Sequence, residues 1–174
     1  MPDFVSRAGA KLEHALTALS IDPANKICAD LGCSTGGFTD CLLQHGAAKV
    51  YAVDTGYGVL DWKLRKDHRV IVMERTNAMH VELPEPVSLV TIDVAWTKQR
   101  YILPAAGKLL SQRGQIVTLD GQHVQARERR EPGDRQSGAT HRADHAAARL
   151  GRSHRAADLE QASEAATKRR MVDV

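Results

Sequence analysis

The sequence predicts an α/β fold in which a mostly parallel β-sheet is covered by helices on both faces. Three observations lead to this prediction. Five short runs rich in apolar residues lie between residues 26 and 119, amphipathic runs separate them, and a glycine-rich turn follows the first run. Strands that alternate with helices at this spacing form right-handed βαβ units, whose crossover helices cover a parallel sheet on both faces.

The predicted strands are short runs of Val, Ile, Leu and Ala bounded by polar or turn-forming residues. Runs of this length and composition are typical of buried strands in a parallel sheet. The five strands are predicted at residues 26–31, 49–54, 69–74, 87–93 and 114–119.

The predicted helices have apolar residues at the three- to four-residue spacing of one helix face. The second of them ends on Gly46, which suits the position after a helix C-cap. The fourth contains Pro104 and Gly107, which we expect to weaken it. The four segments are residues 9–19, 36–46, 57–67 and 100–110.

The composition of the chain changes near residue 120. Every Phe, Trp, Tyr and Ile lies at or before Ile116, and the later residues are rich in Ala, Arg, Asp and Gln. A segment with so few large apolar residues cannot build a core of its own. We therefore predict one α/β domain over residues 1–119, truncated at its C-terminal strands, and a disordered or loosely helical tail over residues 120–174.

The composition also limits the class of protein. With 174 residues, 43% of them hydrophobic and 26% charged, the chain suits one soluble core. No apolar stretch approaches the roughly twenty residues that span a bilayer, and no secretory signal is visible, so we expect a cytoplasmic protein. Three cysteines without CxxC spacing and eight histidines without an HExxH motif predict no metal site. The net charge of +3 permits an anionic partner without requiring one.

The stretch "ADLGCSTGGFTDCLL" at residues 29–43 combines a strand, a glycine turn and the start of a helix. Glycine permits positive φ and a close approach of the backbone to a bound molecule. Ligands of open α/β sheets lie beyond the carboxyl ends of the strands. Asp54 follows Gly36 by eighteen residues, close to the distance at which an acid accepts hydrogen bonds from a ribose. These features indicate a nucleoside ligand, although the turn alone could be an ordinary strand-to-helix connection.

The chemistry of this turn favours one kind of nucleoside. Its glycines match neither the dinucleotide pattern nor the P-loop, and no lysine follows to bind phosphates. A carboxylate as close as Asp30 would repel a pyrophosphate and suit a cationic or zwitterionic ligand. S-adenosylmethionine has both an adenosine for Asp54 and an amino-acid end for the turn.

Four separated motifs carry a resemblance to a known family. They are "VSRAGAKLEHAL", "DLGCSTGGFTDCLLQHGAAKVYAVDTGYG", "ERTNA" and "LVTIDVAW". Over about residues 4–119 the chain resembles the hemolysin A / FtsJ-like family of S-adenosylmethionine-dependent ribosomal RNA 2′-O-methyltransferases. The resemblance implies a Rossmann-like methyltransferase fold, S-adenosylmethionine as cofactor, and ribosomal RNA or a ribosomal subunit as partner.

The resemblance also implies roles for individual residues. Lys11 and Asp93 match the lysine and aspartate of the family's catalytic set, and Asp93 also borders the cofactor. A ribose hydroxyl is a poor nucleophile, so transfer requires it to be aligned and relieved of its proton. A lysine accepts that proton only where its surroundings favour the neutral amine. The implied cofactor-binding residues are Asp30, Gly32, Cys33, Ser34, Thr35, Gly36, Gly37, Phe38, Asp54, which would bind the ribose, and Asn77, which would lie by the adenine.

The chain departs from the family pattern after the fifth predicted strand. The family continues with a lysine-proline pair and later a glutamate, whereas this chain has Asp120 and Gly121, and neither Glu128 nor Glu131 can be assigned to the later role. Many members also carry a small S4-type RNA-binding domain before the segment that begins at Val5, which we expect this chain to lack.

These departures keep a second hypothesis open, in which the protein is a catalytically inactive member that binds the cofactor or RNA. A membrane-acting hemolysin is disfavoured, because no amphipathic or membrane-spanning segment stands out.

Overall fold

The computed structural model of the protein describes residues 3–94, 97–120, 123–128 and 141–143, which lie in one compact unit, Met1–Asp144. In chain order the elements are α1 (Arg7–Ala18), β1 (Ile27–Leu31), α2 (Gly37–Gln44), β2 (Lys49–Val53), α3 (Trp62–Arg65), β3 (Val70–Met73), β4 (Val87–Ile92), α4 (Gln99–Leu109), β5 (Leu110–Asp120), β6 (His123–Glu128) and β7 (His141–Ala143).

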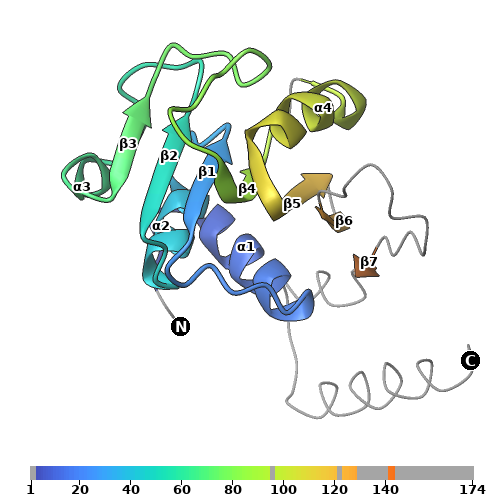
Figure 1. Ribbon diagram of the computed structural model, residues 1–174. Coiled ribbons are helices and arrows are strands. Elements are labelled where there is room, and N and C mark those ends of the chain that lie inside the picture. The colour runs from blue at the N-terminus through green and yellow to red at the C-terminus, as the bar shows by residue number, and fades with distance from the viewer. Residues whose placement is uncertain (1–2, 95–96, 121–122, 129–140, 144–174) are drawn as a thin grey trace, which may run out of the picture. The chain divides into compact units, whose positions relative to one another are not determined.

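The strands of this described part form one sheet in the order β3-β2-β1-β4-β5-β6-β7 (Figure 1). The first five strands in this order pair in parallel, and β6 and β7 pair antiparallel. The strand order reverses at β1, whose neighbours are β2 and β4. The carboxyl ends of β1 and β4 therefore lie at the topological switch point, where open α/β sheets bind ligands.

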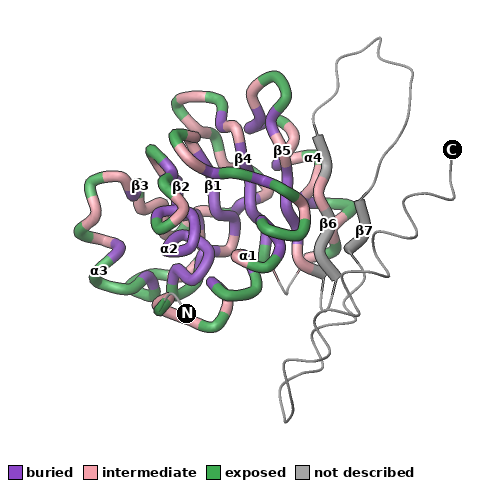
Figure 2. The backbone as a smooth tube through the Cα atoms, turned by 90° about the horizontal axis from the view of Figure 1, so that it is seen from below, coloured by how far each residue is buried: buried purple, intermediate pink, exposed green. Residues whose placement is uncertain are grey.

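Helices cover both faces of the sheet. One core cluster joins α1, α2 and α3 to one face through residues such as Leu12, Leu42 and Leu64. A second cluster joins α4 to the opposite face through residues such as Ile102 and Ala106. Figure 2 shows the buried residues gathered in α2 and in the central strands. The predicted mostly parallel sheet with helices on both faces is confirmed.

The predicted elements match the observed ones most closely in the central strands. The predicted C-terminal glycine of α2 is also confirmed, because Gly46 has φ +81° just beyond the helix. The helix predicted at 57–67 is shorter than expected. Gly58 has φ +72° and is not helical, and the helix starts only where the side chain of Asp61 accepts a hydrogen bond from Lys63 N.

The fourth helix is stronger than the sequence predicts. α4 continues through Pro104 and Gly107 without a break. The proline removes one backbone donor, but Ile102, Ala106 and Leu109 are buried on the face that packs against the sheet. Tertiary packing therefore outweighs the local preference of the sequence.

Part of the segment predicted as a disordered or loosely helical tail forms strands instead. β6 pairs with β5 along its whole length, and β7 pairs with β6. Main-chain hydrogen bonds can extend a sheet without large apolar side chains, and the edge of β5 would otherwise lack a partner on that side. Ala126 of β6 also packs against the first core cluster. The rest of the predicted tail, from residue 144, lies outside the described residues.

We expect Leu89→Ala to lower the free energy of unfolding by about 2–5 kcal/mol, because Leu89 is fully buried in β4 at the centre of the sheet. Urea denaturation followed by circular dichroism measures this change. Ile71→Ala serves as control, since Ile71 lies on edge strand β3 and is 40% exposed; it should cost less than about 1 kcal/mol. Equal losses in the two variants would contradict the assignment of the core.

Candidate functional site

The carboxyl ends of β1, β2 and β4 meet at one edge of the sheet. Gly32 and Cys33, which follow β1, donate their N–H groups to the carbonyl oxygen of Val53 at the end of β2, at 2.9 and 3.1 Å. Asp93, which follows β4, donates its N–H to the carbonyl oxygen of Leu31 at 3.3 Å. The turn after β1 is therefore attached to the strands on both sides of it.

The glycines of this turn are required by its own backbone and packing. Gly32 and Gly36 have φ +85° and +98°, as predicted for the turn. A Cβ on Gly32 would lie 2.6 Å from Val94 Cγ1 and 2.9 Å from the carbonyl oxygen of Asp93, and one on Gly36 would overlap Leu64. The space in front of both glycines is thus filled by protein. A side chain at either position would therefore collide with neighbouring protein atoms.

Asp54 joins the turn after β1 to the loop after β2. Its Oδ2 accepts a hydrogen bond from Ser34 N at 2.8 Å, and its Oδ1 accepts one from Gly56 N at 2.7 Å. Ser34 adopts the left-handed φ of +49°, and both Ser34 and Thr35 are exposed. Each carboxylate oxygen has a second lone pair, so Asp54 can still accept hydrogen bonds from a ligand at this rim.

Asp30 does not reach the rim. Its side chain is fully buried, and it accepts hydrogen bonds from Thr39 Oγ1 at 2.7 Å and from Thr91 Oγ1 at 3.1 Å. Burial raises the pKa of Asp30 to about 6, although both threonine hydrogen bonds oppose the shift. From the sequence this carboxylate was expected beside a cationic ligand, whereas in the structure it links β1 to α2 and β4 from the inside.

Two further residues of the predicted cofactor loop point into the core. Cys33 and Phe38 are 5% and 3% exposed and belong to the core cluster beneath α2. Burial raises the pKa of the Cys33 thiol well above its usual range, so it is not a thiolate nucleophile. Ser34 and Thr35 are therefore the members of the turn whose side chains are exposed.

The loop after β3 completes the rim. Thr76 N donates to the carbonyl oxygen of Asp54 at 2.9 Å, and Arg75 N donates to the carbonyl oxygen of Gly56 at 3.0 Å. Asn77 follows directly and is exposed, with its Oδ1 accepting a hydrogen bond from Met79 N at 2.9 Å. Asn77 and Asp54 are thus brought to the same edge of the sheet, as predicted.

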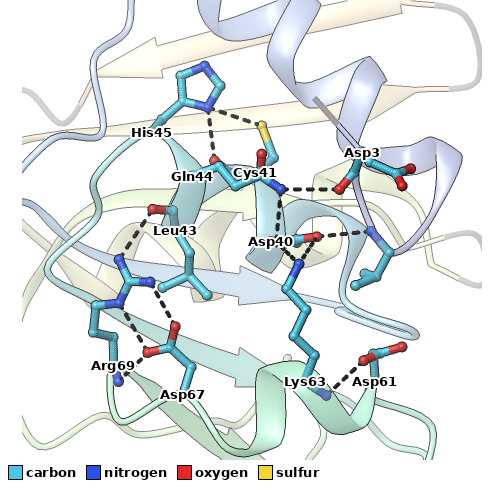
Figure 3. Close-up of polar contacts among 11 residues, drawn as sticks. Asp3, Asp40, Cys41, Leu43, Gln44, His45, Asp61, Lys63, Asp67 and Arg69 are labelled. Atoms are coloured by element: carbon cyan, nitrogen blue, oxygen red, sulfur yellow. Dashed lines mark hydrogen bonds and ion pairs between the residues drawn. The ribbon is translucent and has the colours of Figure 1, made fainter. Parts of the chain in front are cut away.

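Sequence reasoning missed Asp40, which fixes the start of α1. This side chain is 2% exposed and accepts hydrogen bonds from Val5 N at 2.9 Å, Gln44 Nε2 at 3.1 Å and Lys63 Nζ at 3.3 Å (Figure 3). One carboxylate therefore connects the segment before α1 with α2 and α3. An acid inside the apolar run "GGFTDCLL" was the available signal.

The two predicted catalytic residues lie on different elements and are both exposed. Lys11 lies in α1, whose first turn contacts the start of α2: a Cβ on Gly37 would lie 2.9 Å from Gly9 N. Asp93 lies beside Gly32 on the other side of the turn. No hydrogen bond or ion pair between Lys11 and Asp93 is present in the described part of the chain, so the structure brings both to the borders of the turn without joining them.

The positions at which the sequence departs from the family pattern lie beyond the side chains that the structure describes. The strand β5 ends at Asp120, and Gly121, Glu131 and the side chain of Glu128 are not described. These residues therefore keep no assigned role.

Two kinds of feature are absent from the residues that the structure describes. Among them, no three His, Cys, Asp or Glu side chains are grouped so as to hold a metal ion. Across the same residues, every helix is too short or too polar to cross a bilayer.

Comparisons with known proteins identify the family to which the chain is similar. The model of the FtsJ-like methyltransferase family matches residues 4–133. Hemolysin A of Brachyspira hyodysenteriae is 46% identical over 123 residues, which cover 67% of this chain and 50% of that protein. The 16S/23S rRNA (cytidine-2′-O)-methyltransferase TlyA of Mycobacterium tuberculosis is 47% identical over 120 residues, which cover 67% of this chain and 44% of that protein.

A solved structure from Streptococcus thermophilus has 44% sequence identity and a TM-score of 0.65, covering 68% of this chain and 44% of that one. The chain thus spans about half, or less, of the length of the relatives that it matches.

We expect Asp30→Asn to remove a pH dependence of stability. Because the native pKa of about 6 exceeds the ordinary 3.8, the folded protein binds this proton more tightly than the unfolded chain. Wild-type stability should therefore fall as the pH rises from about 4 to about 6. Asparagine can bond both threonines without a charge, so its stability relative to wild type should rise by on the order of 2–3 kcal/mol over that interval. Urea denaturation of both proteins at pH 4.5 and pH 7 measures this; parallel profiles would contradict it.

Proposed function

Because the chain belongs to the FtsJ-like methyltransferase family, we propose that it transfers a methyl group from S-adenosylmethionine to the 2′-hydroxyl of a ribose in RNA. Ribosomal RNA, free or within a ribosomal subunit in the cytoplasm, is the proposed substrate, since the relative TlyA is named as an rRNA (cytidine-2′-O)-methyltransferase. The observation that carries this proposal is the meeting of the turn after β1, Asp54 and Asp93 at the switch point of the sheet.

The residues at this edge fit the proposed cofactor. Asp54 is half-buried, and two backbone N–H groups fix the orientation of its carboxylate. The remaining lone pairs of the two oxygens can accept hydrogen bonds from the two hydroxyls of a ribose. Asn77, in the loop after β3, is proposed to lie by the adenine, and the exposed Ser34 and Thr35 lie at the turn. The amino-acid end of the cofactor is proposed to lie by the exposed residues of the turn that precedes α2.

The buried members of the predicted loop support this site from within. Asp30 bonds Thr39 and Thr91, and Phe38 packs in the core. We propose that Asp30 and Phe38 act by fixing the backbone of Gly32 to Gly37, which borders the cofactor, and not by touching it with their side chains.

The proposed chemistry needs little from the protein beyond position and charge. The cofactor supplies an electrophilic methyl group attached to a positively charged sulfur. Asp93 is exposed beside Gly32, where its carboxylate can orient a ribose hydroxyl and attract its proton. Lys11 approaches from α1, which Asp40 anchors against α2 through Val5, and it can stabilise negative charge that develops on the attacking oxygen.

One observation favours a second candidate function, binding without transfer. Lys11 is exposed, and Asp120 and Gly121 stand where the family pattern has a lysine-proline pair. A protein that binds the cofactor or RNA but lacks the complete catalytic set would have this sequence. Cofactor binding alone does not separate the two candidates, whereas transfer does.

We expect Asp54→Ala to weaken S-adenosylmethionine binding by at least about tenfold, because it removes charged acceptors for the ribose and releases Ser34 N. Isothermal titration calorimetry with the cofactor measures the affinity. Asp61→Ala is a matched control in the same loop, since Asp61 caps α3 and does not contact the turn with its side chain. An unchanged affinity in Asp54→Ala would remove the basis of the proposed site.

We expect Asp93→Ala and Lys11→Ala each to lower kcat by about 100-fold or more, with the cofactor affinity within about threefold of wild type. Transfer of tritiated methyl groups to undermethylated ribosomal subunits measures kcat. Lys108→Ala, which removes an exposed lysine in the last turn of α4, should leave kcat unchanged. Wild-type protein that binds the cofactor but transfers no methyl group would favour the second candidate.

A further inference from the structure

Exposed aromatic rings with a cation over one face form a distinct surface feature of the described residues. Tyr57 is 70% exposed and Trp62 is 67% exposed. The guanidinium of Arg75 lies 4.3 Å from the ring centroid of Tyr57, and the ammonium of Lys66 lies 4.9 Å from that of Trp62. Aromatic rings beside cations are a common means of holding unpaired nucleotides.

The Tyr57–Arg75 pair lies at the rim of the proposed active site. Tyr57 follows Gly56, whose N–H is bonded to the carboxylate of Asp54 and whose carbonyl oxygen is bonded to Arg75 N. Gly58 N on the other side of Tyr57 donates to Glu74 Oε1 at 2.7 Å. The backbone on both sides of Tyr57 is therefore fixed by hydrogen bonds, close to the carboxylate that would bind the ribose of the cofactor.

Arg75 adopts a strained backbone conformation, and its side chain lies over the ring of Tyr57. Its φ is +52°, a conformation that costs about 1 kcal/mol or more for residues other than glycine. Glycine would occupy this position at lower cost, but it would leave the face of Tyr57 without its cation. The preceding residue, Glu74, forms an ion pair with Arg65, whereas the guanidinium of Arg75 lies over the ring of Tyr57. A strained residue at such a rim is a reason to look for a function.

We propose that Tyr57 and Arg75 form a platform on which an unpaired base of the RNA substrate stacks, next to the nucleotide that receives the methyl group. The inference rests on the proposed function and adds the place where the substrate strand is held. The exposed face of Tyr57 accepts any base, because every base has a π-face. Arg75 covers the other face and supplies the positive charge that a neighbouring phosphate requires.

A nucleobase can reach this platform from two sources, the substrate strand or the adenine of the cofactor. The structure favours the strand, because Asp54 and Asn77 already lie at the rim for the adenosine while the ring of Tyr57 extends into solvent. Trp62 provides a matched comparison. It carries a similarly exposed ring, but its cation, Lys66, is the C-cap residue of the same short helix, so this pair does not join two loops of the rim.

The test uses a single-stranded RNA oligonucleotide that contains 2-aminopurine, whose fluorescence falls when the base stacks. With the full chain and saturating S-adenosylmethionine, we expect quenching in wild type and in Tyr57→Phe, and little in Tyr57→Ala. The dissociation constant should rise roughly 5- to 100-fold in Tyr57→Ala. Arg75→Gly is chosen because glycine adopts the left-handed backbone of this position without strain. It should reduce the slope of the logarithm of RNA affinity against the logarithm of salt concentration by about one, because one phosphate contact is lost. Trp62→Ala should match wild type.

Several outcomes would overturn the inference. Equal oligonucleotide affinity in wild type and Tyr57→Ala would assign the ring to another use, such as a protein contact, as would a wild type without affinity for the oligonucleotide. An equal loss in Trp62→Ala would remove the specificity of the platform. A weaker affinity for S-adenosylmethionine in Tyr57→Ala, measured by calorimetry without RNA, would assign the ring to the cofactor. Tyr57-dependent quenching in a protein that transfers no methyl group would leave the platform intact and reject only the proposed transfer.

Discussion

The carboxylate of Asp54 is the interaction on which the rest of the site depends. Its two oxygens hold Ser34 N and Gly56 N, and so they fix the turn after β1 and the loop after β2 at one edge of the sheet. The loop after β3 is then attached through the carbonyl oxygens of Asp54 and Gly56. The carboxylate thus adds side-chain hydrogen bonds to the backbone hydrogen bonds that already join these three loops at the rim.

Two further carboxylates support the same turn from inside the protein. Asp30 joins β1 to α2 and β4, and Asp40 joins α2 to α3 and to the segment before α1. Buried carboxylates are costly unless their hydrogen bonds are satisfied, and both of these are satisfied by several donors. Rigid support of this kind allows Ser34, Thr35 and Asp93 to remain exposed at the rim and still keep their positions.

The fold was predictable wherever apolar residues form continuous runs or recur at helical spacing along the sequence. The central strands are continuous apolar runs, and the faces of α1 and α2 follow helical spacing, so local patterns were sufficient. The prediction failed at α4, where burial of Ile102 and Leu109 outweighs Pro104, and at β6, whose pairing depends on main-chain hydrogen bonds and not on apolar side chains. The site was predicted as a set of residues, but Asp30, Cys33 and Phe38 proved to face inward.

The sequence by itself determined the five parallel strands, the helices α1 and α2 and the residues that end at the carboxyl edge, because periodicity and glycine positions act over a few residues. Only the tertiary structure decided which side chains of the turn face outward, that Asp40 anchors α1, and that Arg75 lies over the ring of Tyr57. These features depend on contacts between residues distant in the chain, and the direction of a side chain follows from what packs around it.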